Sequence, residues 1–396
     1  DLHSFPTRRS SDLWQILLED TDRYRNRSIG MIVNQTSVTT NDIRYSWEAL
    51  RRKGLNIKRI FSPEHGLFAT EQDQIAVENQ ASVECELVSL YGSSAKTLVP
   101  DTALLDDLDL VVFDIQDVGT RYYTYVNTLA LFMEAVSGKD IEILVLDRPN
   151  PLGGAIVEGP MLEDAFRSFV GLFPVPVRHG MTAGELAHLY ADLKQLDLQV
   201  TTLAMKGWRR SMLFSETGLP WIPPSPNMPT CATAEVYPGM CLFEGLNISE
   251  GRGTTTPFQL SGAPFIRPEE LAERCRQYQL EGVAFRPTWF RPTFHKFRAE
   301  VVGAIWLQVT DHERFRSFAT AVAMVSAIRE LYGNRLRFLN GVYEFNDSIP
   351  AFDLLAGSSR IRTSILGNCD PEELIASWRR DETAFSQEKE RYHLYT

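Results

Sequence analysis

The stretch at residues 108–125, LDLVVFDIQDVGTRYYTY, decides the fold that the sequence predicts. Its first six residues are apolar apart from one aspartate, a pattern typical of a buried strand. Its second half gathers two aspartates, a glutamine, an arginine and three tyrosines. Ligands of an open α/β sheet bind beyond the carboxyl ends of its strands, so the change at Asp114 predicts a functional site. Alternatively, Asp114 and Asp117 cap the helix that follows.

Strand and helix signals alternate on both sides of this stretch, with short connections. Apolar runs predict further strands at 28–33, 57–61, 84–90 (weakly), 141–146 and 200–205. One helix is expected from Asn41 to Gly54, with Ile43, Trp47 and Leu50 on one face. Others are expected over 125–136 and after the capping box of Thr182 and Glu185. This order predicts βαβ units and a parallel sheet, and so an α/β, Rossmann-like catalytic domain over residues 14–234.

The chain changes character between residues 221 and 258. Five prolines between residues 220 and 229 argue against helix, and glycines recur from 239 to 253. We expect a fixed loop there, lying against the crevice of the first domain. Residues 235–396 are expected to form a smaller α+β domain that frames the cleft. Its helices open at Pro268, Asp311 and Asp370, and a strand covers 299–310.

Composition excludes several classes of protein. The 396 residues suggest two domains. The net charge of −11 and the absence of a Lys/Arg block make a nucleic-acid partner unexpected. No apolar run approaches the roughly 18 residues of a membrane span. Residues 1–13 lack an apolar core and are treated as a foreign or disordered lead, not a signal peptide.

Familiar cofactor and metal motifs are missing from the sequence. The five cysteines contain no C-x-x-C pair, which argues against zinc and against a full disulfide framework. Neither a dinucleotide nor an ATP glycine motif follows the first strand, and no G-x-S-x-G or H-E-x-x-H occurs. Asp114 and Asp117 resemble the aspartate pair of haloacid-dehalogenase phosphatases, but their spacing is three rather than two. A magnesium-dependent phosphohydrolase remains an alternative; otherwise no metal or cofactor is expected.

Polar clusters follow the predicted strands at their carboxyl ends. They comprise Asn34, Glu64-His65, Asp114-Asp117, Asp147-Arg148 and Lys206. In a parallel sheet these ends share one edge, so we expect the clusters to face one crevice. Turn chemistry would account for the asparagines and aspartates, but not for Glu64 or Arg148.

Carboxylates and arginines are therefore expected to gather near this crevice. The acids are Glu64, Asp114, Asp117, Asp147, Glu158, Glu244 and Glu250, and the bases are Arg121, Arg148 and Arg252. Glycoside hydrolysis uses a protonated acid and usually a second carboxylate. Tyr122, Tyr123 and Trp208 would suit the apolar face of a sugar, and an arginine fork would suit an acidic substituent. Ion pairs that act as internal struts would produce the same pattern.

Seven strings of sequence, in order from about Ile29 to the C-terminus, resemble the bacterial exo-β-N-acetylmuramidase family, first known only as a domain of unknown function. The strings are SPEHGLF (62–68), VVFDIQDVGTRYYTY (111–125), LDRPNPLGG (146–154), VEGP (157–160), RHGMTAGELA (178–187), PPSPNMPT (223–230) and LFEGLNISEGRGTTTPF (242–258). So many long strings in register are far more specific than a single short motif.

The resemblance implies a fold, an activity and a setting. It implies that the Rossmann-like domain carries the active site. It also implies release of β-1,4-linked N-acetylmuramic acid from the non-reducing end of peptidoglycan fragments, without metal or nucleotide. Muramyl saccharides are thus the expected partners, and a periplasmic or secreted location is expected. A non-catalytic murein-binding protein is the alternative, and the sequence predicts no oligomeric state.

The resemblance also implies residue roles. Glu64, in the SPEHG string, is expected to be the general acid. Asp114 and Glu158 are candidates for the second catalytic group, with Asp117 and Glu250 behind them, unless the substrate's 2-acetamido group takes that part. Arg121, Arg148 or Arg252 is expected to hold the lactyl carboxylate. The expected substrate-binding set is Asn34, His65, Asp117, Arg121, Tyr122, Asp147, Arg148, Asn150, Asn227, Glu250 and Arg252.

Overall fold

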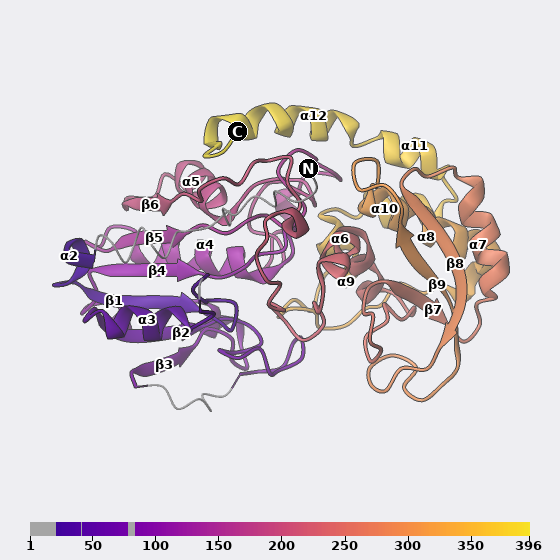
Figure 1. Cartoon of the computed structure of the whole chain (residues 1–396). Coiled ribbons are helices and arrows are strands. Elements are labelled where there is room, and N and C mark those ends of the chain that lie inside the picture. The colour runs from indigo at the N-terminus through magenta and orange to yellow at the C-terminus, as the bar shows by residue number, and fades with distance from the viewer. Residues whose placement is uncertain (1–20, 41, 78–83) are drawn as a thin grey trace, which may run out of the picture.

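The first part of the chain folds around a parallel sheet of six strands (Figure 1). The computed structural model describes residues 21–40, 42–77 and 84–396; the predicted lead and the predicted cap Asn41 lie outside them. The strands are β1 (Ser28–Val33), β2 (Asn56–Ser62), β3 (Glu86–Ser89), β4 (Leu110–Asp114), β5 (Glu142–Leu146) and β6 (Val200–Leu203). Their spatial order is β3-β2-β1-β4-β5-β6, and every neighbouring pair is parallel.

Strand β4 lies near the centre of this sheet, and all five of its residues are buried. It pairs with β1 through Gly30 and Val111, and with β5 through Val111 and Ile143. A side chain at Gly30 would press on Leu108 and Phe61, which explains a glycine inside the strand. The strand order reverses between β1 and β4, so the predicted α/β class is confirmed.

Helices cover this sheet. They are α2 (Thr21–Tyr24), α3 (Ser46–Arg52), α4 (Thr124–Val136) and α5 (Ala183–Lys194). The predicted capping box is confirmed at α5, where Thr182 and Glu185 exchange side-chain and backbone hydrogen bonds. Helix α3 buries Trp47 and Leu50 as predicted, but Ile43 lies before the helix and is exposed.

The proline-rich segment contains a helix that the sequence analysis missed. Helix α6 (Cys231–Met240) begins two residues after the last of the five prolines. Thr230 caps it by accepting a hydrogen bond from the Thr233 amide at 3.2 Å. The prediction of a loop throughout residues 221–258 was therefore wrong here, because the prolines restrict only residues 220–229.

The smaller domain combines an antiparallel sheet with helices (Figure 1). The sheet has the order β7 (Leu260–Ala263), β9 (Val302–Val309), β8 (Val283–Phe290). Helix α7 (Pro268–Gln277) starts at the predicted proline, and α11 (Pro371–Ala376) is capped by Asp370 as predicted. Helix α8 (Ser317–Tyr332) starts six residues after the predicted Asp311, which instead closes a turn before it. The α+β character of this part is confirmed.

The end of the chain returns to the first domain. After α9 (Ala351–Ala356), α10 (Arg360–Leu366) and α11, helix α12 (Arg379–Glu388) crosses towards β6 and α5 (Figure 1). Tyr395 donates a hydrogen bond to Asp147 at 2.6 Å, and Lys389 donates one to the Gly154 carbonyl at 2.6 Å. A buried cluster of apolar side chains runs through both domains. Within the described residues, no helix is long and apolar enough to cross a membrane.

Candidate active site

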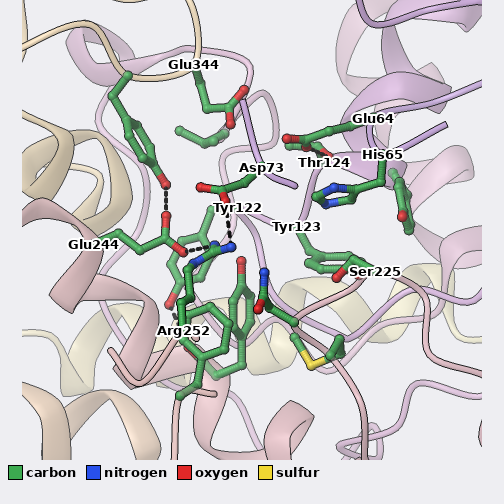
Figure 2. Close-up of a pocket in the computed structure, with 17 residues that line it drawn as sticks. Glu64, His65, Asp73, Tyr122, Tyr123, Thr124, Ser225, Glu244, Arg252 and Glu344 are labelled. Carbon is green, nitrogen blue, oxygen red and sulfur yellow. Dashed lines mark hydrogen bonds and ion pairs between the residues drawn. The ribbon is translucent and has the colours of Figure 1, made fainter. Parts of the chain in front are cut away.

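A pocket of about 490 Å³, partly open to solvent, lies where the two domains meet. From the first domain it is lined by Glu64, His65, Asp73, Tyr122, Thr124 and Asn227. From the second domain it is lined by Tyr237, Glu244, Arg252, Phe258, Tyr343 and Glu344. Figure 2 shows these side chains converging from both sides. The pocket therefore exists only when both domains are in place.

Glu64 follows the carboxyl end of β2 and is 4% exposed. The Thr124 hydroxyl, at the start of α4, donates a hydrogen bond to its Oε2 at 2.7 Å. The backbone amide of Gln74 donates to its Oε1 at 3.4 Å. Both oxygens of Glu64 therefore have a hydrogen-bond donor, and the side chain lies at the N-terminus of α4.

His65 occupies a left-handed backbone conformation, with φ of 69°, that turns the chain sharply after Glu64. Its Nδ1 lies 2.8 Å from the carbonyl oxygen of Glu71. A carbonyl oxygen only accepts, so Nδ1 carries the hydrogen in this contact. The other ring nitrogen, Nε2, is then available to a ligand as an acceptor.

Arg252 joins the two domains through carboxylates (Figure 2). Its guanidinium contacts Asp73 of the first domain at 2.6 Å and Glu244 of the second at 2.7 Å. Glu250 lies 3.3 Å from its Nε. The other oxygen of Glu244 accepts a hydrogen bond from Tyr343 at 2.6 Å. The bidentate geometry of arginine suits this bridging position.

Glu344 reaches the pocket from the second domain and is 7% exposed. Its Oε2 accepts a hydrogen bond from the Tyr91 hydroxyl at 2.8 Å. Burial, and then the negative charge of Glu64, raise the pKa of Glu344 well above its usual range. The pocket thus contains two carboxyl groups, Glu64 and Glu344, with different hydrogen-bond partners.

Aromatic rings form the remaining wall. Tyr237 packs edge-on against Tyr122, Tyr123 and Phe258, with ring centroids 4.8 to 5.7 Å apart. The Tyr122 hydroxyl donates to the carbonyl of Pro238. Such a wall offers apolar contact to the carbon face of a sugar, while the carboxyl groups offer hydrogen bonds to its hydroxyls.

The structure brings five of the predicted site residues into this pocket: Glu64, His65, Tyr122, Asn227 and Arg252. Asn227 donates a hydrogen bond to Gln72 at 2.7 Å, which holds its side chain in the wall of the pocket. The other predicted site residues lie outside it, so the expectation of a single crevice shared by all strand ends was wrong.

Asp114, the last residue of β4, and Arg148, which follows β5, form an ion pair of 2.7 Å. Arg148 lines a separate hollow of about 390 Å³ with Thr36 and Gln116. The pair links the carboxyl end of β4 to the residues after β5. It is thus an internal ion pair, which is the alternative that the sequence left open. Neither Asp114 nor Arg148 is among the residues that line the interdomain pocket.

Four further predicted residues hold loops rather than substrate. Asp117 accepts from the Gly119 amide at 2.6 Å, and Asp147 accepts from Gly184 and Tyr395. Asn34 accepts from the Thr36 amide and hydroxyl. Asn150 donates to Met181, with its side chain against Gly119. These residues do follow strands, but each satisfies nearby backbone groups, as turn residues do.

Three charged residues that were predicted to act on or bind the substrate are buried and bind neighbouring groups of the protein instead. Arg121 donates to the carbonyls of Pro160, Val175 and Leu355, each at 2.9 Å. Glu158 accepts from the Ala319 amide at 2.9 Å, so it stabilises the start of α8. Glu250 is fully buried and is held by Lys296 at 2.9 Å in addition to Arg252. Trp208 also lies elsewhere, packed against Tyr395.

Replacing Glu158 with glutamine is expected to leave kcat within about threefold of wild type, because a glutamine oxygen still accepts the Ala319 hydrogen bond. Burial raises the pKa of Glu158 to about 7, so wild-type stability contributed by this group falls as pH rises from about 4.5 through 7. The variant should lose less stability than wild type between pH 5 and pH 8 in urea unfolding. A kcat loss above a hundredfold would restore Glu158 as a catalytic candidate.

Four important lining residues were not assigned a role from the sequence: Asp73, Thr124, Ser225 and Glu344. Glu344 follows no strand of the parallel sheet and comes from the second domain. One feature of the sequence could have pointed to Glu344. It lies between two aromatic residues in GVYEFNDS (341–348), which is an unusual place for an acid in a loop. Glu244 had been counted among the acids near the crevice.

Among the described residues, no three or more His, Cys, Asp or Glu side chains are grouped so that they could hold a metal ion. Asp114 is committed to Arg148, and Asp117 to the Gly119 amide. These contacts do not favour the magnesium-dependent alternative.

The fold and the pocket define a class: two-domain α/β proteins with a carboxyl-lined, tyrosine-walled pocket at the domain interface. The family described as "Exo-beta-N-acetylmuramidase NamZ" matches this chain with its N-terminal part over residues 29–232 and its C-terminal part over residues 235–395. The chain belongs to this family, and the resemblance found in the sequence is confirmed.

Individual relatives agree with this membership. The chain is 41% identical over 374 residues to the peptidoglycan beta-N-acetylmuramidase NamZ of Bacillus subtilis (strain 168), covering 94% of this chain and 87% of the relative. Crystal structures of two DUF1343 family proteins from Bacteroides fragilis NCTC 9343 are similar. One has a TM-score of 0.88 and 30% identity over 99% of this chain and all of the other. The second has a TM-score of 0.74 and 28% identity over 98% and 99%.

Proposed function

We propose that this protein is an exo-acting glycoside hydrolase that releases β-1,4-linked N-acetylmuramic acid from the non-reducing end of peptidoglycan fragments. Family membership and the 41% identity to a named peptidoglycan β-N-acetylmuramidase support the activity. The structural observation that carries the proposal is the pocket, where Glu64 lies beside further carboxyl groups and an aromatic wall. Hydrolysis of a glycosidic bond between sugars uses a proton on the leaving oxygen and usually a carboxylate near the anomeric carbon.

The pocket residues divide into chemical and binding roles in this proposal. Glu64 is an essential catalytic carboxyl group. His65, Asn227 and the rings of Tyr122 and Tyr237 contact the muramyl residue. Arg252 is the arginine of the predicted three that reaches the pocket, but Asp73, Glu244 and Glu250 already neutralise it. The main role of Arg252 is therefore to hold the shape of the pocket. If it contacts the lactyl carboxylate of the substrate, it does so while it remains paired with these three acids.

The proposed substrate also implies a location. Peptidoglycan lies outside the cytoplasmic membrane, so we place the protein in the periplasm or outside the cell. Detection of the native protein in a periplasmic or culture-medium fraction would support this placement, and exclusive recovery with the cytoplasm would oppose it.

Substrate discrimination tests the proposed activity directly. Purified protein is expected to release para-nitrophenol from para-nitrophenyl N-acetyl-β-muramide and to leave the corresponding glucosaminide intact. A chelator should not lower the rate, whereas it would abolish magnesium-dependent phosphohydrolase activity. Cleavage of the glucosaminide alone would contradict the specificity. Binding of peptidoglycan fragments with no release from any muramyl glycoside would favour the non-catalytic alternative.

A further inference from the structure

The pocket holds four carboxyl groups, and two of them are already committed. Asp73 and Glu244 each form an ion pair with Arg252. Glu64 and Glu344 form no ion pair with any basic side chain in the described ranges. Figure 2 shows both side chains reaching into the pocket, one from each domain. These two are therefore the carboxyl groups able to exchange a proton with a bound ligand.

A constrained turn presents Glu344 to the pocket. Tyr343 and Asn346 exchange two backbone hydrogen bonds, at 2.8 and 2.9 Å, and so close a tight loop around it. Glu344 and Phe345 have φ values of 46° and 65°, in the left-handed region that non-glycine residues seldom adopt. Backbone strain of this kind is concentrated at functional sites, where surrounding contacts hold a side chain in place.

Glu344 lines the pocket and follows Tyr343, a residue that lines both the pocket and a second hollow. This hollow of about 710 Å³, open to solvent, is lined by residues 339–343 and shares Asp73, Glu244 and Tyr343 with the pocket. A saccharide with one sugar in the pocket and the next in the hollow would cross this shared boundary. Its glycosidic oxygen would then pass close to Glu344, which directly follows Tyr343 in the chain.

The surroundings of the two groups differ. Glu64 accepts hydrogen bonds on both oxygens, from the Thr124 hydroxyl and the Gln74 amide. Burial and then the negative charge of Glu64 raise the pKa of Glu344, although the hydrogen bond from Tyr91 lowers it. A buried carboxyl group whose pKa is raised in this way is suited to donate a proton.

We propose that Glu344 is the catalytic proton donor of this hydrolase and that Glu64 is the carboxylate opposite it, an inference that rests on the proposed function. Glu344 gives its proton to the glycosidic oxygen as the bond from that oxygen to C1 breaks, and the oxygen keeps the bonding pair. Water then gives its hydroxyl group to C1, and its remaining proton restores the Glu344 carboxyl, directly or through solvent. Glu64 faces the positive charge that develops at C1. This assigns to Glu344 the role that the resemblance gave to Glu64.

Leaving groups of different basicity test the assignment. The substrates are para-nitrophenyl N-acetyl-β-muramide, whose phenolate departs readily unprotonated, and the disaccharide N-acetylmuramyl-β-1,4-N-acetylglucosamine, whose alkoxide does not. Glu344→Gln is expected to lower kcat on the disaccharide by about 10²- to 10⁴-fold, but on the aryl glycoside by less than about tenfold. It should also flatten the alkaline limb of the pH profile. Glu64→Gln should impair both substrates to a similar extent.

Each outcome decides the point. If the wild-type protein cleaves neither substrate, the proposed function fails. If the wild type cleaves both substrates, three results show that Glu344 is not the donor. The Glu344→Gln variant is normal on both substrates, or it is impaired equally on both. Alternatively, Glu64→Gln shows the same selective loss on the disaccharide. Circular dichroism and thermal unfolding establish that the variant is folded. Should it not fold, Glu344→Asp, which keeps an acid at shorter reach, must show the same ordering of losses.

Discussion

Replacing Glu64 with glutamine is expected to lower kcat on muramyl glycosides by about 10³-fold or more. Glutamine keeps the shape of the side chain and can accept the Thr124 hydrogen bond, but it can neither carry a negative charge nor exchange a proton. The rate is measured with both the aryl glycoside and the disaccharide. A loss on both substrates is expected because Glu64 acts as the carboxylate; if Glu64 were instead the acid that the resemblance implies, the large loss would be confined to the disaccharide.

A matched substitution separates chemistry from folding. Glu48 is exposed on α3 and does not line the pocket, so Glu48→Gln should keep the wild-type rate. The melting temperature of Glu64→Gln should remain within a few degrees of wild type, since the hydrogen-bonding geometry is preserved. A folded Glu64→Gln variant with a near-normal rate would remove Glu64 from the mechanism.

Replacing Arg252 with methionine is expected to destabilise the protein by about 3–5 kcal/mol and to abolish activity. The change leaves Asp73, Glu244 and Glu250 facing one another without their shared cation. It also removes a contact between the two domains, so the pocket should open. The free energy of unfolding is measured by urea denaturation at pH 7.

The effect should depend on pH with a defined sign. Burial alone would raise the pKa of Glu250, but Lys296, His295 and Arg252 lower it below its usual range. Its stabilising contribution is therefore present above about pH 4.5 and is lost as pH falls through the lower folded pKa. The deficit of the methionine variant should accordingly shrink in acid. Arg298→Met, at an exposed position, should change stability by less than about 0.5 kcal/mol. If Arg252→Met lowered the free energy of unfolding by so little, the ion pairs of Arg252 would not stabilise the fold.

Most of the first domain could be predicted from the sequence because its signals are local. Apolar runs mark strands β1, β2, β4 and β5. The capping box of Thr182 and Glu185, a signal only four residues long, marks the start of α5. Parallel pairing follows from alternation with helices. Helix α6 was missed because five nearby prolines outweighed a cap at Thr230, whose effect is equally local.

The site was harder to predict because polar residues choose partners through space. The sequence shows that Asp114 and Asp147 follow strands, but not that Arg148 and Tyr395 satisfy them. Tyr395 is near the end of the chain, and only the return of α12 to the first domain brings it close. Glu344 enters the pocket by docking of the second domain, which no local pattern encodes.

The most direct measurement is a crystal structure of Glu64→Gln with the N-acetylmuramyl-N-acetylglucosamine disaccharide bound. The muramyl ring is predicted to lie in the interdomain pocket, with C1 facing residue 64 and the glycosidic oxygen within hydrogen-bonding distance of Glu344. Density for the sugar in the hollow beside Thr36, Gln116 and Arg148, with the interdomain pocket empty, would contradict the central claim that hydrolysis takes place between the two domains.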